Sequence, residues 1–131
     1  MKKLTFSFML ITLLSSFYNS NTFKGTWEYA GGIYNGKSED APAAYSLHRK
    51  YDNEHYKAYV IEKGYKDEKY EEGDYILKAD TCLETQTYSS QPSKVTGITI
   101  PYLYTLSNDT LTFKGTLPNG LRVIEYWKKV K

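Results

Sequence analysis

The sequence predicts an all-β protein, an eight-stranded antiparallel up-and-down β-barrel that follows a short leader. After residue 22, runs of alternating apolar and polar residues recur between turn-forming residues, and no run keeps a helical period. Gly25-Thr26-Trp27 opens the first run, and the aromatic and cationic stretch Glu125-Tyr126-Trp127-Lys128-Lys129 lies in the last. Because an even number of consecutive antiparallel strands can close on itself, closure would remove the exposed sheet edges.

Residues 1-21 are predicted to be a signal peptide. Lys2 and Lys3 precede an apolar run from Leu4 to Leu14, which is shorter than the roughly 20 residues of a membrane-spanning helix. We therefore expect a secreted or periplasmic protein whose residues 22-131 form one domain. No cysteine directly follows the apolar run, so neither a lipid anchor there nor a transmembrane segment after cleavage is expected.

The charge balance argues against nucleic acid as a partner. The chain has 17 Lys plus Arg and 15 Asp plus Glu, a formal net charge of +2. Lys2 and Lys3 account for that excess, so the domain without its leader is neutral. A neutral domain lacks the sustained basic field that attracts nucleic acid.

The expected strands are about as long as barrel strands usually are, and most connections between them are short. We place them at residues 23-33, 43-51, 55-63, 70-79, 81-89, 97-107, 110-117 and 120-130. Three connections have the residue types of tight turns, namely Asp52-Asn53-Glu54, Ser107-Asn108-Asp109 and Pro118-Asn119-Gly120. These turns predict antiparallel hairpins.

Three further connections are longer or more polar. Residues 34-42, which contain Asn35-Gly36, and residues 91-96 are expected to form a rim or a lid. Residues 63-72 carry charges of both signs and predict a solvated hairpin that extends beyond the barrel.

Alternation along two strands assigns the interior. The sixth expected strand directs one set of side chains inward: Ile98, Ile100, Tyr102, Tyr104 and Leu106. The seventh directs another: Leu111, Phe113, Gly115 and Leu117. Pro101 lacks a donor for the strand ladder, so we expect a bulge or a local break in pairing there.

These motifs together resemble the lipocalin and calycin superfamily, most closely the short lipocalin-like proteins of bacterial envelopes, many of which have no assigned function. Besides the opening and closing motifs, the resemblance rests on Tyr45-Ser46-Leu47 before the Asp52-Asn53 turn, on Gly73-Asp74-Tyr75 and on Thr81-Cys82-Leu83-Glu84. It covers residues 22-130.

The resemblance implies a barrel that is closed at one end by Trp27. A basic side chain of the last strand would pack over the Trp27 ring, a contact worth ~0.5-2 kcal/mol. Lys128 and Lys129 are the candidates for this contact, and Gly25 and Trp127 belong to the same closing structure.

Two carboxylates and an arginine are candidates for a polar site inside the barrel. Alternation places Glu84 with Cys82 and Glu125 with Trp127, which points both carboxylates inward, and Arg49 is their plausible partner. The site would orient a ligand beside apolar and aromatic walls, for which we expect Tyr45, Tyr75, Tyr102, Tyr104 and Phe113. The alternative is that the strands slip at a bulge and the charges face solvent.

The sequence predicts neither a catalytic centre nor a metal or cofactor site. His48 and His55 have no third ligand at zinc spacing, and the acidic residues of 63-72 are interleaved with lysines. Cys82, the single cysteine, is expected to be a small buried residue without a disulfide partner.

We therefore expect a non-catalytic protein that binds a small, partly apolar or amphipathic molecule inside the barrel. An eight-stranded barrel can also be filled by its own side chains. The alternative function is then a protein-binding or inhibitor module for an envelope partner, acting through residues 34-42, 64-72 and 90-96.

Overall fold

The computed structural model describes residues 23–131. The predicted signal peptide and residue 22 lie outside the described residues. Within residues 23–131 every regular element is a strand, and no helix of a length and hydrophobicity suited to crossing a membrane is found there.

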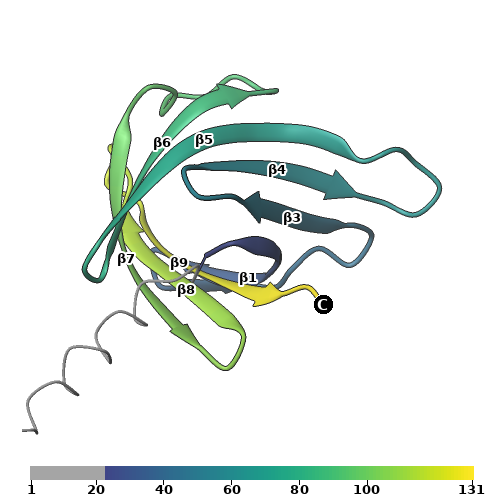
Figure 1. The fold of residues 1–131 in the computed structure, drawn as a ribbon, viewed down its shortest axis with the longest axis horizontal. Helices are drawn as coiled ribbons and strands as arrows, with labels where there is room; N and C mark the ends of the chain where they lie inside the picture. Colours follow the sequence, from purple (N-terminus) through teal and green to yellow (C-terminus); the bar gives the residue numbers. More distant parts are fainter. Residues whose placement is uncertain (1–22) are drawn as a thin grey trace, which may run out of the picture.

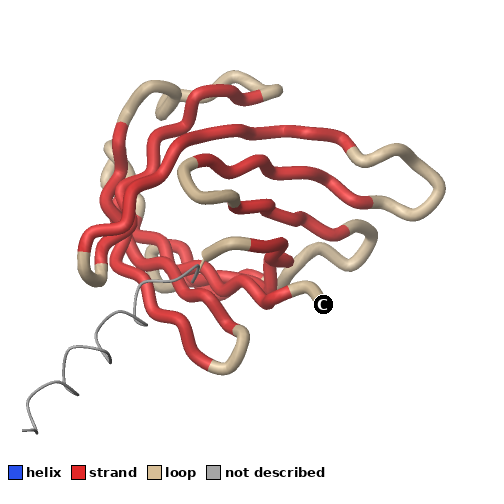
Figure 2. Tube along the Cα trace, in the orientation of Figure 1, coloured by secondary structure: helices blue, strands red, loops and turns tan. Residues whose placement is uncertain are grey.

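Nine strands form one antiparallel sheet that closes on itself (Figures 1 and 2). Their bounds are β1 (Gly25–Tyr34), β2 (Lys37–Glu39), β3 (Ser46–Tyr51), β4 (His55–Ile61), β5 (Glu68–Lys78), β6 (Thr81–Ser89), β7 (Thr99–Ser107), β8 (Thr110–Thr116) and β9 (Arg122–Lys129). Each strand from β3 onward pairs with the next, and β1 pairs with both β3 and β9. The predicted eight-stranded up-and-down barrel is confirmed, and β2 is an additional strand.

Strand β2 occupies the connection that was expected to form a rim or a lid. Asn35 and Gly36 have positive φ angles of 50° and 83°, and they form the tight turn of a β1–β2 hairpin. Glu39 of this hairpin pairs with Gly32 of β1. The first long connection therefore extends the barrel wall at one end.

A bulge in β1 changes which neighbour the strand pairs with. Residues Gly25 to Glu28 pair with β3, and the pairing with β9 shifts register between Tyr29 and Gly32. Gly31 has a φ of 113° and a Cβ there would lie 2.9 Å from the Glu39 carbonyl oxygen, so glycine fits this position. Beyond the bulge β1 pairs with β2, so β1 and β3 part at the end of the barrel that carries β2.

The opposite end is filled by aromatic side chains around Phe23. The ring of Phe23 is 1% exposed and has its centre within 5.0–5.7 Å of the ring centres of Tyr51, Tyr75, Tyr104 and Phe113. The backbone carbonyl of Phe23 also accepts a hydrogen bond of 3.0 Å from Nε1 of Trp27. The residue that precedes β1 thus plugs the barrel.

The expected closing contact is made by Lys129. Its Nζ lies 4.8 Å from the ring centre of Trp27 and donates a 2.7 Å hydrogen bond to the Lys24 carbonyl. A Cβ on Gly25 would lie 2.5 Å from that Nζ, and the φ of 124° at Gly25 is one that other residues rarely adopt.

Two members of the predicted closing structure are placed differently. Lys128 is exposed, because neighbouring residues of a strand face opposite sides of the sheet. Trp127 lies further along the barrel, where its ring contacts Tyr29 with the ring centres 5.3 Å apart.

Strands β7 and β8 confirm much of the predicted interior. Ile100, Leu111 and Phe113 are buried, as expected. Ile98 and Leu106, at the two ends of the expected sixth strand, are 40% and 38% exposed, so the prediction that they face a closed interior was wrong. Ends of strands reach beyond the packed interior of a barrel, which alternation alone does not reveal.

Two further local predictions concern Pro101 and Cys82. The β7–β8 ladder stops at Leu103↔Lys114, which leaves Pro101 beyond its end, while the register with β6 passes through Pro101 unbroken. Pairing is therefore absent at Pro101 on the β8 side only, and no bulge forms there. Cys82 is fully buried, and burial raises the pKa of its thiol.

Candidate functional site

The barrel interior contains two adjoining hollows at the end away from Phe23. The inner one has a volume of about 190 Å³ and the outer one about 380 Å³. Arg49, Glu71 and Glu125 line both, so these three side chains stand where the hollows meet. The outer hollow reaches Asp40 and Tyr45 on the connection between β2 and β3, where β1 and β3 have parted.

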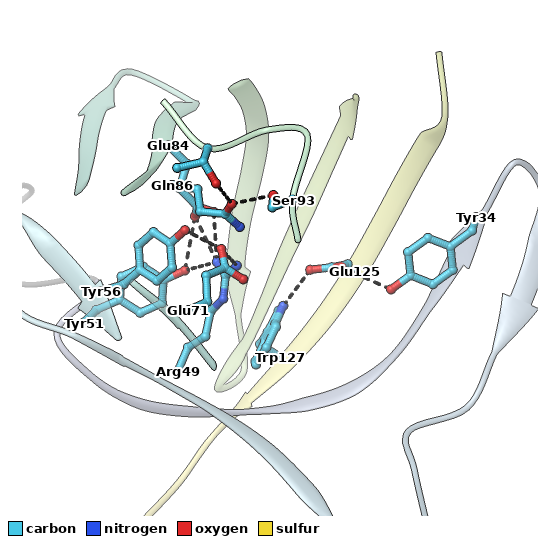
Figure 3. Close-up of polar contacts among 11 residues, drawn as sticks. Tyr34, Arg49, Tyr51, Tyr56, Glu71, Glu84, Gln86, Ser93, Glu125 and Trp127 are labelled. Carbon is cyan, nitrogen blue, oxygen red and sulfur yellow. Dashed lines mark hydrogen bonds and ion pairs between the residues drawn. The ribbon is translucent and has the colours of Figure 1, made fainter. Parts of the chain in front are cut away.

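Arg49 of β3 is the centre of a buried hydrogen-bond network (Figure 3). Its Nη1 donates to both carboxylate oxygens of Glu84 at 3.0 Å and to the hydroxyl of Tyr51 at 2.9 Å. Its Nη2 lies 3.4 Å from Oε2 of Glu71, which also accepts a 2.5 Å hydrogen bond from Tyr56. One guanidinium therefore serves two carboxylates.

Aromatic rings hold the guanidinium of Arg49 in place. Its Cζ lies 4.4 Å from the ring centre of Tyr56 and 5.3 Å from that of Trp127. Desolvated contacts of this kind are worth up to about 2 kcal/mol. The Tyr56 ring lies over Gly73, where a Cβ would come within 2.4 Å of the ring, so the absence of a side chain at Gly73 permits this position.

Glu125 of β9 forms a second polar group, on the side of β1 (Figure 3). It accepts hydrogen bonds from the Tyr34 hydroxyl at 3.1 Å and from Nε1 of Trp127 at 3.2 Å. The hydroxyls of Tyr34 and Tyr29 lie 2.6 Å apart although the residues are five positions apart. A regular strand would direct them to opposite faces, so the bulge in β1 brings Tyr34 inward.

Burial sets the protonation of this network. Burial raises the pKa of Glu84, with Arg49 opposing the rise and Glu71 adding to it. Burial lowers the pKa of Arg49, but the surrounding Glu84, Tyr51 and Glu71 outweigh it and keep the pKa well above its ordinary value. Burial also raises the pKa values of Tyr34 and Tyr56, so both hydroxyls stay protonated and act as donors.

The connection between β6 and β7 borders the inner hollow. The side-chain oxygen of Gln86 in β6 accepts hydrogen bonds from the hydroxyls of Ser93 at 2.6 Å and Thr96 at 2.7 Å. The backbone carbonyl of Gln86 accepts a hydrogen bond from the amide of Gly97 at 2.8 Å. Val95 of this connection lines the inner hollow. The connection predicted to form a rim is thus tied to β6 beside the cavity.

Most of the predicted ligand-binding residues surround the two hollows. Those that line at least one of them are Tyr45, Arg49, Glu84, Tyr102, Phe113 and Glu125. The alternative in which Glu84, Glu125 and Arg49 face solvent does not hold, because Arg49 and Glu84 are 9% and 7% exposed and Glu125 faces the interior.

Two predicted ligand-binding residues lie elsewhere. Tyr75 is part of the aromatic core around Phe23, and its hydroxyl donates to the Asp52 carbonyl. The hydroxyl of Tyr104 donates to the Ala79 carbonyl at 3.1 Å. Both residues belong to the filled end, because alternation gives the face of a residue and not its level along the barrel axis.

Sequence reasoning missed Glu71, Tyr34 and Tyr56 as site residues. Glu71 lies in the segment predicted to be a solvated charged hairpin, and residues 62–67 of that hairpin are indeed exposed at the tip (Figure 1). Glu71 nevertheless faces inward. Continuing the alternation backward from buried Tyr75 would have found it.

A larger hollow, of about 700 Å³, lies on the outside of the barrel wall. Leu103, Lys114 and Ile124 line it. Each is adjacent in its strand to a residue that faces the barrel interior, so each faces outward. We call this hollow the outer groove; it is separate from the outer hollow inside the barrel. The outer groove is mostly apolar and lacks the polar network of the interior, so we take the interior as the candidate site. Within residues 23–131 no group of three or more His, Cys, Asp or Glu is placed to hold a metal ion.

Comparison with known proteins agrees with this architecture. An uncharacterized protein from Bacteroides eggerthii superposes with a TM-score of 0.60 at 16% identity, covering 82% of this chain and 99% of that one. A lipocalin-like protein from Bacteroides uniformis superposes with a TM-score of 0.59 at 17% identity, covering 84% of this chain and all of the other. The fold is lipocalin-like. No protein-family model and no curated protein sequence matches this lipocalin-like chain.

Proposed function

We propose that this chain is a secreted or periplasmic binding protein that takes up a small, partly apolar molecule inside its barrel without transforming it. The observation that carries the proposal is the polar centre of Arg49, Glu71 and Glu125 at the junction of two interior hollows. Ligand sites are typically concave and largely apolar, with a few converging polar groups.

The asymmetry of the interior supports binding at one end. The end around Phe23 is packed with aromatic rings, whereas the end near β2 retains hollows with aromatic and aliphatic walls. Burial of apolar ligand surface there would contribute ~25 cal/mol per Å² before the costs of association. The polar centre would orient the ligand.

The proposal is tested by a thermal-shift and calorimetric screen of residues 22–131 with fatty acids, sterols, haem and aromatic metabolites. A cavity-filling variant, Val95→Trp, is expected to abolish binding of any hit because Val95 lines the inner hollow. Lys94→Trp places the same ring on an exposed neighbour and should leave binding unchanged. Equal binding by both variants would place the ligand outside the barrel.

A second candidate function is capture of a protein partner by the outer groove. Its lining is mostly apolar, and the charged residues that line it within the described chain are the cations Lys114 and Arg122. Such a surface suits an apolar segment flanked by acidic residues in an envelope protein. The contact surface would then be the groove, which includes Gly36 of the connection 34-42, in place of the connections 64-72 and 90-96.

Pull-down from an envelope extract separates this candidate from the first. Leu103→Asp should abolish capture because Leu103 lines the groove and is 53% exposed. Ile76→Asp changes an equally exposed apolar residue outside the groove lining and should preserve capture. Loss with both variants would mean nonspecific adhesion.

A further inference from the structure

We infer that the interior site selects a small organic cation, an amine with an apolar body. This inference rests on the proposed function and specifies its ligand. It follows from the charges, the walls and the unused hydrogen-bonding capacity of the two hollows.

Acidic groups outnumber basic groups around the site. Glu71, Glu84 and Glu125 line the inner hollow with Arg49 as the one basic side chain, and Glu39 and Asp40 add carboxylates at the mouth of the outer hollow. Neither hollow is lined by any lysine or by a second arginine from residues 23–131. The site therefore has a negative field that a cationic ligand would offset.

Arg49 does not neutralise this acidity. Its ion pairs go to Glu84 at 3.0 Å and to Glu71 at 3.4 Å, and Glu125 receives hydrogen bonds from the neutral donors Tyr34 and Trp127. An ionised carboxylate can accept about four hydrogen bonds. Glu125 therefore retains acceptor capacity toward the hollows, and an ammonium group supplies three donors to fill it.

The walls suit a cation that carries hydrocarbon. Five aromatic side chains line the outer hollow, namely Tyr29, Tyr34, Tyr45, Tyr70 and Trp127. Aromatic faces attract cations and bury apolar surface at the same time. A bare metal ion would leave the apolar surface of these walls uncovered, so the walls favour an organic amine.

Matched probes test the inference by calorimetry at pH 7. The probes are built on three hydrocarbon frames: phenyl, hexyl and naphthyl. Each frame is tested as an amine or ethylamine, as the corresponding carboxylate and as the corresponding alcohol. We expect the amine to bind at least about tenfold more tightly than the carboxylate and the alcohol in at least one frame.

Two substitutions assign the effect to the carboxylates. Glu125→Gln should weaken amine binding about tenfold or more while leaving binding of the alcohol within about twofold. Asp40→Asn, at the exposed mouth, should weaken amine binding by a smaller factor without touching the core. Glu62→Gln, an exposed carboxylate away from both hollows, is the control and should have no effect.

The outcomes separate the two proposals. If a carboxylate or an alcohol is the tightest binder, the cation inference is overturned and the binding function stands. If no compound of any frame binds up to millimolar concentration but a fatty acid, sterol, haem or aromatic metabolite does, the cation inference alone is overturned. If nothing in either set binds, the binding function fails and the inference fails with it. If amines bind best but Glu125→Gln and Asp40→Asn leave their affinity unchanged, the carboxylates are not the recognition element.

Discussion

Arg49 is the residue on which the charge balance of the interior depends. Its guanidinium pairs with Glu84 at 3.0 Å and with Glu71 at 3.4 Å, and Glu84 is almost fully buried. Buried carboxylates without a counter-charge are strongly unfavourable, and removal of one partner of a buried pair typically costs about 3–5 kcal/mol. The arginine is thus a structural requirement as well as part of the candidate site.

Arg49→Met is expected to lower the free energy of unfolding by about 3–5 kcal/mol at pH 7. The deficit should shrink as the pH falls toward the ordinary glutamate pKa of about 4.3. Without Arg49 the raised pKa of Glu84 rises further, so the folded state binds protons more tightly than the unfolded state and is stabilised by acid. Urea denaturation at several pH values measures this.

Two outcomes would contradict that account of Arg49. One is a variant as stable as the parent at pH 7. The other is a deficit that grows on acidification, which would mean that the carboxylates are stabilised in their ionised form by other groups. The parent protein, unfolded in urea at the same pH values, supplies the reference free energy of unfolding.

Adjacent lysines at the closed end give a matched pair of substitutions. Lys129→Ala should cost about 0.5–1 kcal/mol of unfolding free energy, because Lys129 covers the Trp27 ring and bonds the Lys24 carbonyl. Lys128→Ala, on the exposed face, should stay within about 0.5 kcal/mol of the parent. Equal effects in denaturant titrations would remove the closing role from Lys129.

At the scale of elements, alternation gave the faces of the strands correctly where the strands are regular. Arg49, Glu84 and Glu125 were predicted to point inward on this basis, and they do. Tyr34 was missed because the β1 bulge reverses the faces of the residues beyond it, and a bulge depends on partner strands that a local pattern does not contain. Glu71 was missed for another reason: it keeps the alternation of Tyr75, but it stands in a run of charges of both signs that predicted a solvated hairpin.

The segment before β1 acts as the plug of the barrel, which the sequence pattern did not indicate. Phe23→Ala should therefore lower the free energy of unfolding by about 3–5 kcal/mol, as truncation of a fully buried phenylalanine does. Tyr65→Ala removes an aromatic ring that is 73% exposed at the tip of the β4–β5 hairpin. This control should change stability by less than about 0.5 kcal/mol. A small effect of Phe23→Ala would show that the plug is dispensable.

At the scale of the whole molecule, the barrel has a filled end and a hollow end. The sequence predicted a closed eight-stranded barrel and left open whether it was filled. Whether the barrel is filled depends on which side chains lie at the same level along the barrel axis, and that level depends on how the strands are aligned with one another. Tyr75 and Tyr104 show the difference, since both face inward as expected and yet pack at the filled end.

The two tryptophans report on these two ends separately. Trp27 lies in the closing structure, whereas Trp127 lines the outer hollow, and the chain has 2 Trp in total. Trp27→Phe therefore leaves Trp127 as the single indole fluorophore, beside the proposed binding site.

The most direct test is a fluorescence titration of Trp27→Phe with the tightest-binding compound of the phenyl, hexyl and naphthyl series, alongside calorimetry of the same samples. Binding inside the barrel predicts a saturable change in Trp127 emission whose midpoint concentration equals that of the calorimetric titration. Calorimetric binding without any change in Trp127 emission would contradict an interior site. If neither this series nor the wider screen contains a compound that binds the parent protein, the binding function itself is contradicted.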